Sequence, residues 1–375
     1  MALSIFADAL PFTEMQANYK EWLPGMQLSE MIPNIAYSSS LHWQLYCNKY
    51  PDERGVLVDW RPYKEENKNV RVLSTILQPL DRFEYISLVL KKMLDRFAFR
   101  RNMFANIPFK FRKEFSERGR YLLWDKSVYG KESIFDGYEV VSQDEGHLSF
   151  DATIEKFYSA LHTTNNPNIF FSTGFADALG HKVRRGDMYS NRMQPYMSRL
   201  REAIVAYLDK YPDEEVLIVS DHGMSTVNKH VDFPLESMFG KPSKKTYIAY
   251  TDSCVMCVWT EDRELESKIA EFLSTREEGH LLTEEEREYY GATDRIFGNI
   301  IYILREGNVF ANSWFGRSLK KPSPDGSGMH GFWPEWSARD QMASVVLINS
   351  SKTLDEHYDY RTAHELIKSV MHKEQ

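Results

Sequence analysis

Two side chains that could bind a metal ion stand next to each other after a short apolar run, Val216 to Val219. Four β-branched or leucine residues in a row are typical of a strand that is buried on both faces. Asp221 and His222 follow, and one ion could bind both only where the strand has ended, because neighbouring side chains in a strand point to opposite faces. Gly223 permits the necessary turn. Since open α/β sheets carry their sites at the carboxyl ends of strands, we interpret the pair as part of a metal site, with a strand cap as the alternative.

Other candidate ligands have similar surroundings. Asp177 and His181 follow the apolar run Asn168 to Thr173 and are four residues apart, so one helical turn or a tight loop brings them onto one face. Asp8 follows the first apolar stretch of the chain and, taken alone, is more simply interpreted as a turn residue. His330 lies between two glycine-bearing segments, a setting that core packing explains poorly.

Six metal-capable side chains thus lie at expected strand ends or in loops: Asp8, Asp177, His181, Asp221, His222 and His330. Three carboxylates and three imidazoles form a mixed oxygen and nitrogen set, which suits zinc or manganese better than an all-oxygen magnesium site. Six ligands exceed what one tetrahedral ion needs, so two divalent ions are the economical interpretation. A pair of ions about 4 Å apart stabilises both the attacking and the leaving oxygen of an in-line phosphoryl displacement.

A nucleophile is offered by three serines, Ser38 to Ser40, which precede an expected helix that runs to Cys47. They could cap this helix. They could equally place an attacking hydroxyl at its N-terminus, where the dipole and the first N–H groups favour negative charge. A nearby metal ion would lower the pKa of such a hydroxyl and activate it.

The elements around these residues alternate between strand and helix. A polar stretch around Pro24 follows the first apolar run. An amphipathic helix over 196–211 leads into the 216–219 strand, and a strand over 342–348 precedes a closing helix. This pattern predicts an α/β fold, an αβα sandwich around a mostly parallel, doubly wound sheet. We expect one catalytic domain over residues 1–375, with insertions at about 63–148 and about 231–326.

The first insertion carries apolar residues at helical spacing from Asp81 to Phe104, which predicts a helix. Aromatic and basic residues then alternate to Arg112. This segment either covers an anionic substrate or is an amphipathic insertion packed on the core, and the two interpretations are compatible.

Composition narrows the classes of partner. A net charge of −8 argues against nucleic acid as a bulk partner. Three cysteines are too few for a disulfide framework, and we interpret Cys254 and Cys257 as core residues. No stretch reaches the apolar length of a membrane span, and nothing resembles a signal peptide, so we expect a cytoplasmic protein. The sequence leaves the oligomeric state open.

At this point the chain resembles the alkaline phosphatase superfamily, and within it the nucleotide pyrophosphatase/phosphodiesterase branch. The matching features are, in the family's order, the strand-end Asp8, the turn Tyr50-Pro51-x-x-x-Gly55, the pair Asp177 and His181, the run Ser220-Asp221-His222-Gly223-Met224, and His330-Gly331. The resemblance implies an alkaline-phosphatase-like sandwich with two metal ions, usually zinc. One ion would be held by Asp177, His181 and His330, and the other by Asp8, Asp221 and His222.

The resemblance also implies a covalent phospho-enzyme on a hydroxyl nucleophile. Counting back from Tyr50 to His42 places Ser38 at the nucleophile position, with Ser39 and Ser40 as alternatives. Leu41 replaces the asparagine that normally helps to hold a phosphate oxygen. Candidate substrate-binding residues are His42, Arg184 and Arg185.

We therefore expect a metal-dependent phosphodiesterase or nucleotide pyrophosphatase that acts on a small phosphorylated substrate, with a nucleotide as one candidate. Within the same superfamily, a phosphomonoesterase, a phosphonate C–P hydrolase and a phosphosugar mutase remain alternatives. A binding protein without turnover is a lesser one.

Overall fold

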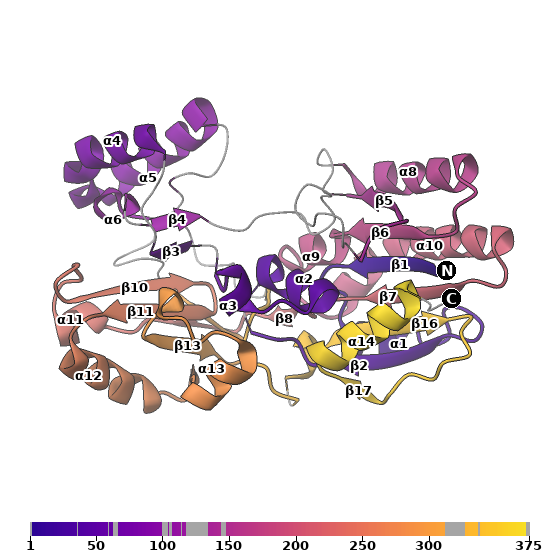
Figure 1. Ribbon diagram of the computed structural model, residues 1–375. Coiled ribbons are helices and arrows are strands. Elements are labelled where there is room, and N and C mark those ends of the chain that lie inside the picture. The colour runs from indigo at the N-terminus through magenta and orange to yellow at the C-terminus, as the bar shows by residue number, and fades with distance from the viewer. Residues whose placement is uncertain are drawn as a thin grey trace. The chain divides into compact units, whose positions relative to one another are not determined.

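A computed structural model describes residues 2–35, 37–58, 60–62, 67–99, 104, 107–113, 115–117, 134–143, 148–311, 327–336 and 338–372. The chain divides into two compact units (Figure 1). The first unit comprises Met1–Lys49, Tyr121–Val227 and Asp325–Gln375, and the second comprises Tyr50–Arg120 and Asn228–Pro324. The expectation of one catalytic domain with two insertions stays a prediction.

The first unit is built on a seven-stranded sheet with the order β17-β2-β16-β7-β1-β6-β5. Its strands are β1 (Ala2–Ala7), β2 (Gln27–Met31), β5 (Glu139–Ser142), β6 (Ile169–Thr173), β7 (Glu215–Val219), β16 (Ala343–Ile348) and β17 (His357–Tyr358). Only β16 runs against its neighbours, since β7, β1, β6 and β5 pair in parallel and β17 is parallel to β2. The predicted, mostly parallel sheet is confirmed.

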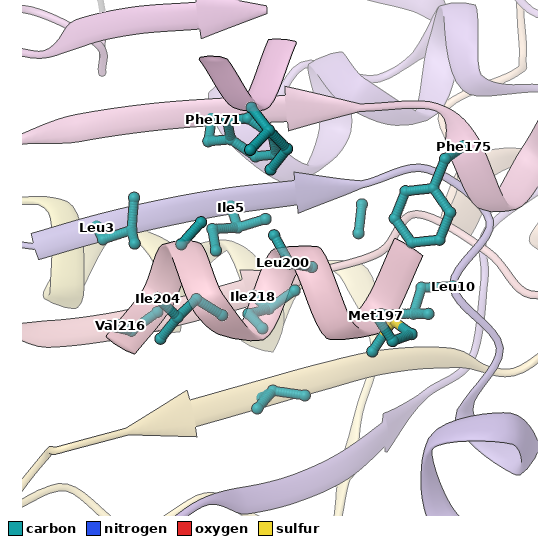
Figure 2. Packing of buried hydrophobic residues seen from close by; sticks show 14 of the residues in the cluster. Leu3, Ile5, Leu10, Phe171, Phe175, Met197, Leu200, Ile204, Val216 and Ile218 are labelled. Carbon is teal, nitrogen blue, oxygen red and sulfur yellow. The ribbon is translucent and has the colours of Figure 1, made fainter. Parts of the chain in front are cut away.

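Helices cover both faces of this sheet. Leu3 and Ile5 of β1 pack with Leu200 and Ile204 of α10 (Asp187–Lys210) on one face, where α8 (Phe150–Thr163) joins the same core (Figure 2). Phe6 alternates to the other face, where α2 (Ser38–Cys47) and α14 (Tyr360–Met371) cover the sheet. Apolar side chains on both sides of every central strand produce the predicted αβα sandwich.

Shorter elements complete the first unit. They are α1 (Phe12–Asn18), α9 (Phe175–Gly180), a 3-10 helix over Arg339–Gln341, and the antiparallel pair β8 (Ser225–Thr226) and β15 (Gly328–Met329). Among the helices of the described residues, none has the length and apolar content to cross a bilayer.

The polar stretch around Pro24 contains an interior strand, β2, that the sequence does not indicate. Its Glu30 is buried, a position that an alternating apolar pattern would give to a hydrophobic residue. Arg339 contacts this carboxylate at 2.7 Å and His357 contacts it at 2.9 Å. The charge is thus balanced by residues more than 300 positions away, which no local pattern reveals.

The second unit contains a four-stranded antiparallel sheet, β10-β11-β13-β12. These strands are β10 (Tyr247–Asp252), β11 (Val255–Thr260), β12 (Gly279–Leu281) and β13 (Ile300–Leu304), with the helices α11 (Leu235–Phe239), α12 (Arg263–Ser274) and α13 (Glu284–Tyr290) and a 3-10 helix over Arg295–Phe297. Two small sheets pair β9 (Lys229–Val231) with β14 (Asn308–Phe310) and β3 (Trp60–Pro62) with β4 (Phe115–Glu117). Cys254 and Cys257 are buried core residues, as predicted.

A helical segment precedes β4 in the second unit. It consists of α4 (Lys68–Leu77), a 3-10 helix over Gln78–Arg82, α5 (Glu84–Met93), a π-helix over Leu94–Phe99 and α6 (Phe109–Arg112). The sequence predicts one helix from Asp81 to Phe104, but the helix is divided, and residues 100–103 lie outside the described part. Phe104 and Phe109 pack on Val70, and Arg112 is fully buried, which agrees with the packed-insertion interpretation of these residues.

Candidate active site

Three neighbouring strands of the first unit bring their carboxyl ends to one edge of the sheet. The register pairs Ala7 with Thr173 and Phe6 with Val219, so β6, β1 and β7 end side by side. The residues that follow these strands are therefore neighbours in space although they are far apart in the sequence. Asp8 continues the alignment, since its N–H donates to the carbonyl of Thr173 at 2.9 Å.

The first ligand group, which we call the strand-end group, consists of Asp8, Asp221 and His222, with one ligand atom from each within 4.8 Å of the others. His222 Nε2 lies 3.5 Å from Asp8 Oδ1 and 3.4 Å from Asp221 Oδ2. The other carboxylate oxygen of Asp221 accepts hydrogen bonds from the backbone N–H groups of Ala9 and His222, at 3.3 and 3.1 Å. Oδ2 is thereby directed toward the ligand cluster.

The second ligand group, which we call the α9 group, consists of Asp177, His181 and His330, with ligand atoms within the same 4.8 Å limit. Asp177 Oδ1 lies 3.0 Å from His181 Nε2 and 3.6 Å from His330 Nε2. Asp177 and His181 are one turn apart at α9, which is the predicted geometry. The two groups meet where the rings of His222 and His330 stack at 3.7 Å with an angle of 9°.

The histidines are oriented as metal ligands require. His181 Nδ1 is 3.1 Å from the carbonyl oxygen of Gly328, and His222 Nδ1 is 2.8 Å from that of Gly223. A carbonyl oxygen only accepts hydrogen bonds, so each Nδ1 carries the proton. The lone pair is then on Nε2, the atom that faces the carboxylates, and a hydrogen bond on the opposite nitrogen is the usual support for a ligating imidazole.

The spacing of the ligand atoms fits a divalent cation. Two ligands at zinc–ligand distances in a tetrahedral arrangement lie about 3.4 Å from each other. Both distances from His222 Nε2 in the strand-end group, and the Asp177–His330 distance in the α9 group, are 3.4–3.6 Å. These distances are longer than the donor–acceptor distance of an ordinary N–H···O hydrogen bond. The mixed donor set and its spacing therefore suit one ion in each group.

The charge states agree with this fit. Burial alone would raise the pKa of Asp221, but His222 and then His42 lower it below the usual aspartate value. The pKa of Asp177 is also lowered: burial alone would raise it, but His181 and His330 lower it by more. Burial lowers the pKa of His330 well below its ordinary range, with His222 adding to the effect. Ionised carboxylates and neutral imidazoles are the forms that bind metal ions.

Ser38 is the first residue of α2 and faces the strand-end group. Its hydroxyl oxygen is 3.1 Å from His222 Nε2. Ser40, one of the two alternatives, is buried, and its hydroxyl accepts a hydrogen bond from Gln44 at 3.2 Å. The side chain of Ser39 lies outside the described part. The structure thus brings Ser38, rather than Ser40, to the six ligands.

The three candidate substrate-binding residues have different surroundings. His42 Nε2 lies 3.4 Å from Asp221 Oδ2, so it contacts a ligand directly. Arg185 forms an ion pair with the buried Glu14 at 3.1 Å and lies over the ring of Tyr189. Arg184 is exposed and lines a polar hollow of about 830 Å³ together with Arg185.

Two further residues support the site: Tyr360, which has no sequence signal, and Gly223, which the sequence indicates only as a turn residue. The hydroxyl of Tyr360, at the start of α14, donates to the backbone carbonyl of Asp221. Gly223 donates its N–H to the carbonyl of Gln341 at 2.7 Å, and a Cβ there would lie 2.7 Å from the carbonyl oxygen of Met342. Close backbone approach, in addition to a turn, therefore requires glycine after the Asp–His pair.

The αβα sandwich with these residues at the carboxyl edge of its sheet is an alkaline-phosphatase-like fold. The chain is similar to murine ectonucleotide pyrophosphatase/phosphodiesterase 5, with a TM-score of 0.62 and 10% sequence identity over 99% of this chain and 94% of that one. A structure of an inactive variant of the murine protein in complex with AMP gives a TM-score of 0.60 at 12% identity, and the human protein gives 0.58 at 12%, each with the same coverage.

No protein-family model matches the chain, and no curated protein matches it in sequence. At 10–12% identity these structural likenesses establish the fold. The activity has to be argued from the site.

Proposed function

We propose that this protein hydrolyses phosphodiester or pyrophosphate bonds of a small, nucleotide-like substrate, with Ser38 as the nucleophile and two divalent ions bound to the strand-end and α9 groups. The observation that carries the proposal is the convergence of three carboxylates and three imidazoles beside one serine hydroxyl. Zinc fits the ligand set best, and manganese is the second choice.

The residues of the chain would have the following roles in the reaction. Bound ions would supply Lewis acidity to the attacking and leaving oxygens. Ser38 Oγ would lose its proton and form a bond to phosphorus while the bond to the leaving alcohol or phosphate breaks, and the leaving group would take up a proton in exchange. Water would then hydrolyse the ester on Ser38 and restore its hydroxyl. The N-terminus of α2 contributes partial positive charge beside the transferred group.

Support for a nucleotide-like substrate comes from the neighbour that was solved with AMP. Leu41, on α2, is buried in the core, so the amide that helps to hold phosphate in the resembling family has no counterpart at this position. We therefore rank phosphodiesters first and keep phosphomonoesters, phosphonates and phosphosugars as assay substrates.

The test is turnover by the full-length protein after chelation and reconstitution with zinc or manganese. Bis(p-nitrophenyl) phosphate, p-nitrophenyl phosphate, phosphonoacetate and a dinucleotide would be compared. We expect metal-dependent hydrolysis of a diester, reduced on the order of 10³-fold or more by Ser38→Ala. Intact-mass measurement of enzyme mixed with substrate should find a phosphoryl-containing adduct that Ser38→Ala removes.

Ser40→Ala is the matched control, because it deletes a neighbouring hydroxyl that faces Gln44. It should retain most of the turnover. Full turnover by Ser38→Ala, or turnover that survives metal removal, would overturn the proposal.

A further inference from the structure

A cluster of exposed apolar side chains lies on the helical segment of the second unit. Twelve large hydrophobic residues are exposed in the described part of the chain, and eight of them fall between Val72 and Phe97. These eight are Val72, Ile76, Phe83, Tyr85, Ile86, Val89, Met93 and Phe97. Exposed apolar residues scattered singly need no explanation, but a concentration in one short segment marks an interaction surface.

The exposed residues of α5 and the π-helix form a second face, separate from the one that packs. Leu90 and Leu94 point to the small core around Val70, Phe104 and Phe109. Five others are exposed, and we call them the outer face: Tyr85, Ile86, Val89, Met93 and Phe97, the last with 70% of its surface accessible. Since the core contacts are already made by the opposite side of the helix, packing of the unit does not explain these residues.

The exposed charges that the structure describes around this face all have one sign. Every exposed charged side chain that the structure describes within 67–99 is a cation: Lys68, Arg71, Arg82, Lys92 and Arg96. The described acids of the segment are turned inward. Asp81 accepts hydrogen bonds from the N–H groups of Phe109 and Lys110, at 2.9 and 2.8 Å, and Asp95 accepts one from Phe104 at 2.9 Å.

Cations and rings are also paired along the segment. The guanidinium of Arg82 lies 4.6 Å from the ring centre of Phe83, and that of Arg96 lies 5.9 Å from the ring centre of Phe97. This places positive charge next to exposed aromatic surface, in a chain whose net charge is −8. An apolar stripe with lysine and arginine on its flanks is the pattern of helices that lie in a membrane interface.

We propose that the outer face docks on the surface of an anionic lipid bilayer, with its apolar side chains in the headgroup region and Arg82, Lys92 and Arg96 at the lipid phosphates. Charge complementarity selects this partner, because an acidic protein is otherwise repelled by an anionic surface. The helix lies on the bilayer and does not cross it. The inference does not depend on the proposed function, because binding requires no turnover.

The test is sedimentation of the full-length protein with phosphatidylcholine vesicles that contain one quarter phosphatidylglycerol, at low salt. We expect binding that falls as salt rises and that is lost with pure phosphatidylcholine. The triple change Arg82→Gln, Lys92→Gln, Arg96→Gln should weaken binding on the order of 100-fold, at about fivefold per cation. The triple change Ile86→Ser, Met93→Ser, Phe97→Ser should weaken it at least about tenfold.

Matched controls change equally exposed residues elsewhere. The apolar control is Met188→Ser, Met238→Ser, Tyr289→Ser, and the charge control is Lys241→Gln, Lys245→Gln, Arg263→Gln. Both should bind like the unchanged protein. Thermal melting of every variant checks the fold. In addition, a tryptophan at position 97 (Phe97→Trp) should shift its emission to shorter wavelength with anionic vesicles, whereas Met238→Trp should not.

Three outcomes would overturn the inference. The unchanged protein could stay in the supernatant with anionic vesicles at low salt, or the outer-face variants could sediment as well as the controls. A concentration-dependent dimer in ultracentrifugation, abolished by the outer-face changes and unaccompanied by vesicle binding, would assign this face to a second copy of the chain.

Discussion

The two ligand groups differ in how the fold holds them. In the strand-end group, Asp221 and His222 are almost completely buried, and the loop backbone after β1 and β7 supplies the hydrogen bonds of Asp221, whereas the side chain of Asp8 is 20% exposed. In the α9 group, the side chains of Asp177, on α9, and of His181, directly after this helix, are 27% and 35% exposed, and that of His330 is 9% exposed. The comparison teaches that two candidate metal-binding groups at one sheet edge can differ in accessibility, and we expect ions bound to them to differ in affinity.

The largest effect should come from Asp221→Asn. The change removes the negative charge of a fully buried ligand, and water cannot reach that position to replace it. We expect loss of the ion from the strand-end group and a fall in diester turnover on the order of 10³-fold. Elemental analysis of metal per chain and kcat measure the two effects.

Asp213→Asn, at an exposed position two residues before β7, is the control and should change neither quantity. An Asp221→Asn protein with full metal content and unchanged turnover would contradict the assignment of the strand-end group as a metal site.

A smaller effect is expected from His181→Ala. This ligand is partly exposed, so water and excess metal ion have access to its position after truncation. Turnover should fall on the order of 100-fold and should recover substantially in millimolar zinc or manganese, in contrast to Asp221→Asn. His162→Ala, at an exposed position on α8, is the matched control. If added metal rescued both variants equally, the difference in accessibility between the groups would have no functional meaning.

The smallest effect should come from His42→Gln. His42 lies 3.4 Å from Asp221 Oδ2 and packs edge-on against Phe6, so its imidazole orients a ligand carboxylate. We expect a loss of about tenfold in zinc affinity at the strand-end group and a similar loss in turnover, with the α9 group unaffected. Competitive metal titration separates the two groups. A change in KM with unchanged metal affinity would instead make His42 a substrate-binding residue.

Much of the sheet could be predicted because its central strands are continuous apolar runs. The 216–219 and 342–348 strands are apolar on both faces, and each was expected within one residue of its observed bounds. The alternation of strand and helix also predicted which edge of the sheet carries the site. β2 could not be predicted, because the partners that balance its buried Glu30 are distant in the sequence.

The six ligand candidates could be identified because carboxylates and imidazoles at strand ends are unusual. Their roles as metal ligands stay predictions. The choice between Ser38 and Ser40 required coordinates, since only the direction of each side chain on α2 distinguishes them. Arg185 was expected near substrate, but its neighbour Glu14 is a buried acid in a helix that the sequence did not reveal.

The position of β16 between β2 and β7 has a consequence for biosynthesis. β2 emerges from the ribosome more than 300 residues before the strand that joins it to the rest of the sheet. At a synthesis rate of about 5–20 residues per second, β2 remains without this partner strand for on the order of 15–60 s. During that time an unpaired strand is exposed to other nascent chains. Pairing of β2 with β16 is therefore a late event, and aggregation of truncated chains should be its main competitor in the cell.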